Sequence, residues 1–279
     1  MKIKLVTDSA SDITKEDAKK LDCAVVSLTV ILGDKSYTDG VDVTAEDIYK
    51  YVDKNNVLPK TAANNEYTYE EVFKKYSSSY DAVVHIALSS GISASCNNAE
   101  AAAKKFNNVF VVDSLSLSSG LALLLYKARE LANEGKTGKQ IAETLNKLTH
   151  KVQASFVVET LDYLKMGGRC SMLQALGANV FKIRPSLVLI NGKIIAGKKH
   201  RGKQIEVIKS YVADILATHP NADLSRCFVT HSKINPEYAE VVKQAAKEFG
   251  FNEVLEREAQ CTIVSHCGPG TIGLLYIDK

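Results

Sequence analysis

An apolar run at residues 81–88 ends abruptly in Ser89-Ser90-Gly91-Ile92-Ser93-Ala94-Ser95, and an alanine-rich stretch follows from 97 to 106. The run suits a buried parallel strand, and the stretch after it suits a helix. Because a helix start presents unbonded backbone N–H groups, the hydroxyl-rich corner between them suits an anionic head group held by neutral donors. The corner lacks the lysine and the glycine spacing of a nucleotide-phosphate loop. We therefore expect an anionic ligand other than ATP.

Strand-like and helix-like segments alternate throughout the first half of the chain. This alternation predicts an α/β layer with a mainly parallel sheet. The expected strands are 3–7, 24–31, 82–88 and 108–112, with an edge-like piece at 35–38, and the expected helices are 15–20, 45–54, 68–78, 93–105, 117–134 and 138–150.

The second half has a different pattern. Asn191-Gly192 separates two β-rich runs, which is the strongest short-range signal for a hairpin and implies a mixed sheet. The expected elements are strands at 182–190, 193–200, 226–231, 252–258 and 272–277 and helices at 203–217 and 236–248. Because the pattern changes near Lys151, we expect two α/β domains, 1–150 and 151–279, with the ligand site between them.

Composition excludes several classes of function. The net charge of this 279-residue chain is +3, and its basic clusters, such as 198–201, are short and lack aromatic partners, so nucleic-acid binding is not expected. No apolar run approaches the ~20 residues that span a bilayer, although transient membrane contact stays open. The N-terminus shows no secretion signal, and the six cysteines show no Cys-x-x-Cys spacing, which together predict a cytoplasmic location.

Four segments could carry chemistry. Asp8 follows the first strand, where it is either a functional acid or part of a turn. Thr61 lies in a loop stiffened by the preceding Pro-Lys, and it is either a positioned donor or structural. Arg169 follows two glycines and could bind a carboxylate or phosphate or form an ion pair between domains.

His266 precedes the tight turn Gly268-Pro269-Gly270 and is a general base, a donor to an anion or a structural residue. Together with Cys261 and Cys267 it would supply three metal ligands, but no fourth is evident nearby, so we expect no metal. The chain has no Gly-x-Ser-x-Gly elbow, no His-Glu-x-x-His and no Gly-x-Gly-x-x-Gly.

Seven short motifs occur in an order that resembles the DegV family, and the resemblance covers nearly the whole chain. The motifs are Thr7-Asp8-Ser9, Tyr37-Thr38-Asp39-Gly40-Val41-Asp42, Pro59-Lys60-Thr61, Ser89-Ser90-Gly91-Ile92-Ser93, Tyr163-Leu164-Lys165-Met166-Gly167-Gly168-Arg169, Lys199-His200-Arg201-Gly202 and His266-Cys267-Gly268-Pro269-Gly270. The resemblance implies two α/β domains, the first with three layers, and a long-chain fatty acid such as palmitate or oleate held between them.

The family's fatty-acid-binding members are acyl carriers of bacterial fatty acid kinase systems, and this implies roles for particular residues. Thr61 and Ser93 would hydrogen-bond the carboxylate, while Arg201, His266 and Arg169 would lie near the head group or face the partner. A separate kinase subunit would phosphorylate the carboxylate, so the chain itself would be neither an enzyme nor bound to a cofactor. Two alternatives stay open: a phosphotransfer or hydrolytic enzyme that uses Asp8 or His266, and a binding module for another anion.

The chain departs from the family pattern at two places. Ala62 stands where a serine is usual, and Ser93-Ala94-Ser95 stands where Ser-Gly-Thr is common. Both departures leave Thr61 and Ser93, the two residues expected to bind the carboxylate, in place. They put the detailed geometry of the head-group site in doubt. Three apolar segments could line a tunnel for the tail or could be ordinary core, namely 121–125, 173–176 and 187–190. None of them reveals the chain length or the unsaturation of the acid.

Overall fold

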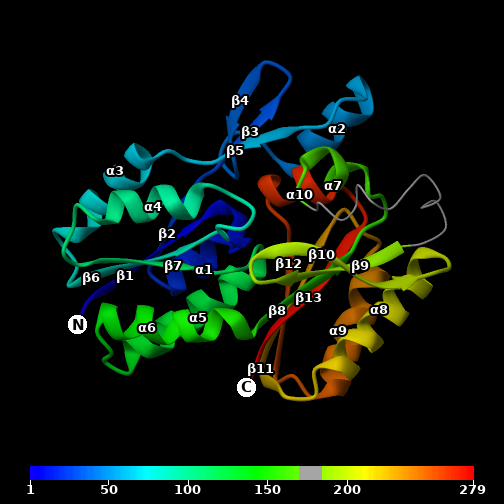
Figure 1. The fold of residues 1–279 in the computed structure, drawn as a ribbon. Coiled ribbons are helices and arrows are strands. Elements are labelled where there is room, and N and C mark those ends of the chain that lie inside the picture. The colour runs from blue at the N-terminus through cyan, green and yellow to red at the C-terminus, as the bar shows by residue number, and fades with distance from the viewer. Residues whose placement is uncertain (170–183) are drawn as a thin grey trace.

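The computed structural model describes residues 1–169 and 184–279, which are arranged around three β-sheets (Figure 1). The first sheet has four strands, and all neighbouring strands are parallel, as the alternating pattern predicts. Its strands, in spatial order, are β2 (Cys23–Val26), β1 (Ile3–Asp8), β6 (Ala82–Ala87) and β7 (Val109–Asp113).

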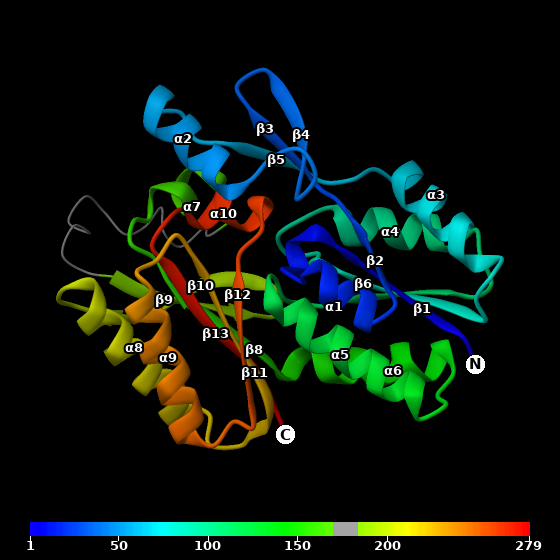
Figure 2. The ribbon, with the colours of Figure 1, turned by 180° about the vertical axis from the view of Figure 1, so that it is seen from behind.

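Helices cover both faces of this sheet and make three layers (Figures 1 and 2). Because successive side chains of a strand point to opposite faces, Leu5 packs on one side and its neighbour Val6 on the other. The two faces are covered by α5 (Ser119–Asn133) and α6 (Gly138–Leu148) on one side and by α3 (Glu66–Ser77) and α4 (Ser95–Ala103) on the other. The short α1 (Lys15–Lys20) lies where it was expected.

The second sheet has six strands in mixed orientation, in agreement with the sequence. Its order is β10 (Lys193–His200), β9 (Arg184–Ile190), β8 (Val152–Val157), β13 (Thr271–Asp278), β11 (Ala222–Ser232) and β12 (Glu253–Glu258). Asn191 and Gly192 both take positive φ in the β9–β10 turn, which confirms the predicted hairpin. One face of the sheet is covered by α8 (Gln204–Thr218) and α9 (Pro236–Phe249).

A third, antiparallel sheet contains β4 (Lys35–Thr38), β3 (Thr29–Leu32) and β5 (Lys60–Ala62). The apolar face of the sheet packs with α2 (Ala45–Asn55) against α10 (Cys261–Cys267). The single strand expected over 24–31 is therefore wrong, because β2 and β3 belong to different sheets. The chain leaves the parallel sheet between them, where the Leu28 N–H donates to Ser9 Oγ at 3.0 Å and the Leu28 carbonyl accepts from Asp39 N at 2.9 Å.

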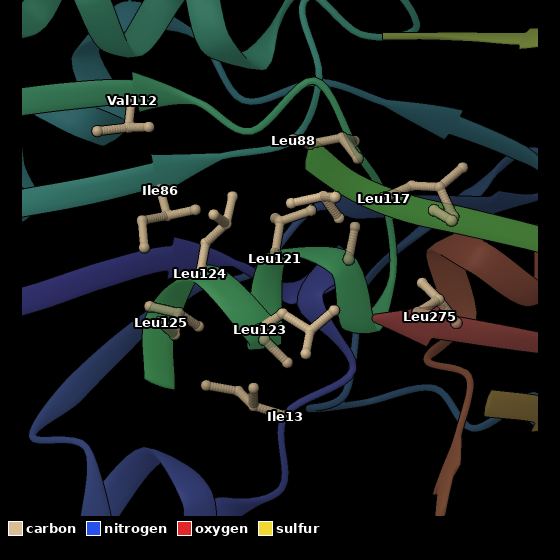
Figure 3. Packing of buried hydrophobic residues seen from close by; sticks show 14 of the residues in the cluster. Ile13, Ile86, Leu88, Val112, Leu117, Leu121, Leu123, Leu124, Leu125 and Leu275 are labelled. Carbon is tan, nitrogen blue, oxygen red and sulfur yellow. The ribbon is translucent and has the colours of Figure 1, made fainter. Parts of the chain in front are cut away.

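The largest hydrophobic core lies between the two large sheets, with α5 at its centre. Figure 3 shows leucines of α5 pointing toward Ile86 and Val112 on the parallel-sheet side and toward Leu275 of β13 on the other. Two elements of this region were not predicted from the sequence, the central strand β8 and the helix α10. No helix within the described ranges is long and apolar enough to cross a membrane.

Candidate functional site

A cavity of about 230 Å³ opens beyond the carboxyl ends of β6 and β7, where the three sheets meet. This is the edge of a parallel sheet at which ligands usually bind. Both halves of the chain line the cavity, and most of its wall is apolar. The apolar side chains are Leu28, Leu88, Ile92, Leu117, Phe156, Leu164, Ile194, Ile263 and Leu275.

Neither of the apolar segments 121–125 and 187–190 lines this cavity. Residues 121–125 are core, whereas 187–190 is core only in part, because Leu187 and Leu189 are buried but Ile190 is exposed. Leu121 and Leu187 are fully buried in the core between the large sheets. The third candidate segment, 173–176, lies outside the described residues. The cavity wall thus comes mostly from strand ends and loops that carry only one or two apolar residues each.

Four of the predicted site residues line the cavity: Thr61, Ser93, Arg169 and His266. Thr61 lies on β5 and pairs with Val30 of β3, and His266 lies in the last turn of α10. Their side chains meet, with Thr61 Oγ1 2.7 Å from His266 Nε2. The fold therefore brings together two candidates whose relation is invisible in the sequence.

Burial holds His266 in its neutral form. Burial, and secondly the positive charge of Arg169, lowers the pKa of His266 to about 4. Its Nδ1 is buried and finds no hydrogen-bond partner among the described residues, and Gly167 packs so closely that a Cβ there would come within 2.7 Å of this atom. An Nδ1 atom buried without a partner costs less free energy as an unprotonated nitrogen than as an N–H group that has no acceptor. The proton therefore belongs on Nε2, which donates to Thr61 Oγ1 and leaves the threonine hydroxyl proton free for a ligand.

Ser93 lies at the end of the serine-rich corner, two residues before the start of α4. Its backbone N–H donates to the Ser89 carbonyl at 3.1 Å, and Ser89 Oγ donates to the Gly192 carbonyl at 2.8 Å. The turn of the β9–β10 hairpin thus rests on this corner. The sequence predicts unbonded N–H groups at this helix start, but the Ser95 N–H donates to Ser93 Oγ at 3.2 Å.

Two other candidates lie away from the cavity wall. Asp8 is fully buried and accepts from the Tyr69 hydroxyl at 2.6 Å and from Leu88 N at 2.8 Å, and it does not line the cavity. Arg201 is exposed after the end of β10, and it does not line the cavity either.

Two carboxylates that the sequence analysis missed hold α10 in place. Asp39 accepts from the backbone N–H groups of Cys261 at 3.0 Å and Thr262 at 3.2 Å, at the positive end of the helix. Asp12 accepts from Gln260 N at 2.8 Å and from the Ser118 hydroxyl, and burial raises the pKa of Asp12 to about 8. Asp39 lies within one of the seven motifs, which was the available signal, but its role required α10 to be recognised first.

The structure shows no cluster of three or more potential metal ligands in the part of the chain that it describes. Cys261 and Cys267 lie at opposite ends of α10, and the Cys261 thiol donates to the Val43 carbonyl at 3.3 Å. The three residues considered as metal ligands therefore do not converge.

Comparison with known proteins places this architecture in a family. A family model described as "Uncharacterised protein, DegV family" matches residues 2–279. A DegV domain-containing protein of Caldanaerobacter subterraneus is 29% identical over 282 residues, which cover 100% of this chain and 99% of the relative. The solved structure entitled "Fatty Acid Binding of a DegV family Protein from Thermus thermophilus" is 28% identical, covers 100% of both chains and superposes with a TM-score of 0.88. That of "DegV, a fatty acid binding protein from Bacillus subtilis" is 27% identical, with 100% of both chains covered and a TM-score of 0.87. The chain belongs to the DegV family.

Proposed function

We propose that the protein binds a long-chain fatty acid in this cavity, with the tail along the apolar wall and the carboxylate at Thr61 and Ser93. The observation that carries the proposal is an apolar cavity that ends at the paired Thr61 and His266 side chains. The fatty-acid-binding relatives from Thermus thermophilus and Bacillus subtilis, which match over the whole chain, support it. We propose that the protein has two domains, 1–150 and 151–279, and that the cavity lies between them.

The tail and the head group are expected to contribute different amounts of binding free energy. Burying about 15 methylenes at about 0.8 kcal/mol each gives a gross gain of ~12 kcal/mol. A hydroxyl donating to a carboxylate contributes about 1.5–3 kcal/mol. The tail therefore dominates the affinity, and Thr61 and Ser93 fix the position of the head group.

The protein acts, in this proposal, as a carrier that presents the acid to a separate fatty acid kinase. The Arg169 side chain is exposed and also lines the cavity, so the head group lies near a surface that a partner could reach. Arg201 is exposed and would face that partner. The proposal needs neither a cofactor nor nucleic acid. An enzyme that uses Asp8 lacks support, because Asp8 does not line the cavity.

We also propose a cytoplasmic location. The five cysteines that the structure describes are all buried free thiols, which suits a reducing compartment.

Native mass spectrometry of the purified protein tests the binding proposal. We expect a co-purified long-chain acid, or uptake of palmitate or oleate after delipidation. A protein that stays lipid-free when either acid is offered would overturn the proposal. The Thr61→Ala/Ser93→Ala double variant should retain most of the lipid, while NMR of palmitate labelled at its carboxyl carbon should show a more mobile head group.

The carrier role has its own test. Loaded protein incubated with ATP alone should yield no acyl phosphate, as measured by hydroxylamine trapping. The same mixture with a fatty acid kinase subunit should yield it. Product formed without the kinase would contradict the carrier role while leaving fatty-acid binding intact.

A further inference from the structure

The Ser93 hydroxyl points toward a neighbour that lies outside the cavity wall. Ser93 Oγ donates to Ser95 Oγ at 2.9 Å, and the Ser95 N–H donates back to Ser93 Oγ at 3.2 Å. Ser95 is fully buried at the first turn of α4 and does not line the cavity. Ser93 therefore lines the cavity, but its hydroxyl proton is donated to Ser95, which does not.

A hydroxyl has one proton to donate and can accept as well. The single proton of Ser93 goes to Ser95 Oγ, and the Ser93 oxygen already accepts from the Ser95 N–H. In this arrangement Ser93 offers no proton to the cavity.

We infer that Ser95 is a positioning residue that turns the Ser93 hydroxyl away from the cavity and so weakens its hold on the ligand carboxylate. This inference rests on the proposed function. A carboxylate that enters must rotate the Ser93 hydroxyl, which exchanges a neutral hydrogen bond for a stronger, charge-assisted one. The exchange is favourable, but its net gain is reduced by the bond that is lost. A carrier that hands its acid to another protein benefits from a head group that can leave.

Ser95→Ala releases the Ser93 proton, because it removes the hydroxyl that accepts it. Ser95→Thr keeps the hydroxyl and is the matched control. Ser93→Ala and the Ser93→Ala/Ser95→Ala double variant complete a cycle that isolates the coupling between the two serines.

Calorimetric titration of the delipidated proteins with palmitate is the experiment. We expect Ser95→Ala to bind about 2- to 10-fold more tightly than the wild type, the equivalent of one neutral hydrogen bond. Ser95→Thr should match the wild type. In the Ser93→Ala background, Ser95→Ala should have no effect, which a general loosening of the fold could not produce.

Two results would overturn the inference. The first is unchanged or weaker binding by Ser95→Ala, in a variant whose denaturant midpoint shows that it is folded. The second is tightening that persists without Ser93. A wild-type protein that takes up no fatty acid would overturn the proposed function and this inference with it. Normal wild-type binding with unshifted variants would overturn the inference alone.

Discussion

Thr61 Oγ1 lies 2.7 Å from His266 Nε2, although 205 residues separate the two along the chain. The pair joins an edge strand of the small sheet to the last turn of α10. Because neutral His266 donates from Nε2, the Thr61 hydroxyl keeps its own proton free. The pair itself is neutral, and the positive charge of the cavity wall comes from Arg169.

The first prediction concerns the Thr61 hydroxyl. Thr61→Val keeps the shape of the side chain and removes its donor, so we expect the affinity for palmitate to fall about 10- to 100-fold, as measured by titration. The acid should still co-purify, because the tail supplies most of the binding energy. Thr61→Ser retains the hydroxyl and should bind within a few-fold of the wild type. Equal affinity of the valine variant would remove Thr61 from the head-group site.

The second prediction concerns stability at mildly acid pH. Burial lowers the pKa of His266 to about 4 in the folded protein, whereas the unfolded chain has the ordinary value of 6.5. Between these values the unfolded state binds a proton that the folded state does not, so stability falls as the pH drops from 6.5 to 4. The full loss is up to about 3 kcal/mol.

Urea unfolding of the delipidated protein at several pH values between 4 and 7 measures this loss. Other groups titrate in the same range, so the informative quantity is the difference between the wild type and His266→Gln. Glutamine stays neutral and can still donate to Thr61. The variant should lose less stability than the wild type over this range, and parallel curves would show that His266 does not carry the effect.

The third prediction concerns Asp12 and has the opposite sign. Burial raises the pKa of Asp12 from 3.8 to about 8, so between these values the folded state keeps a proton that the unfolded state releases. This group therefore lowers stability as the pH rises from 4 to 8. Asp12→Asn imitates the neutral form and can still accept from Gln260 N. The variant should gain stability relative to the wild type as the pH is raised from 5 to 8, and a constant difference would contradict the assignment.

Local pattern was sufficient for the parallel sheet and the hairpin but not for α10. The segment Cys261–Cys267 is rich in β-branched and small polar residues, which have modest helix propensity. Asp39 and Asp12, more than 200 residues earlier in the chain, supply the acceptors for its first N–H groups. A helix whose start depends on such distant carboxylates gives no local signal.

The break between β2 and β3 has a similar cause. The pattern of residues 24–31 predicts a single strand. The bond from Leu28 N to Ser9 Oγ shows where the pairing of β2 with the parallel sheet has ended. The same limit applies to the site. Family resemblance indicated Thr61 and Ser93, but the groups that orient their hydroxyls, His266 and Ser95, act through contacts that only the fold reveals.

The last prediction concerns the contact between the serine corner and the β9–β10 turn. A Cβ at Gly91 would overlap the carbonyl oxygen of Gly192, although the backbone of Gly91 needs no positive φ. Gly91→Ala should therefore push the hairpin away from the corner, which costs about 1–3 kcal/mol of unfolding free energy in denaturant titration.

The same displacement should reach the cavity, because Ile92 and Ile194, one residue beyond Gly91 and two beyond Gly192, both line it. We expect Gly91→Ala to bind palmitate more weakly and to release it faster in a stopped-flow transfer to albumin. Ser90→Ala alters the exposed neighbour and leaves the glycine contact intact, so it should change stability by less than about 1 kcal/mol. If Gly91→Ala matches this control in both stability and release rate, then the contact between the hairpin turn and the serine corner does not affect the cavity.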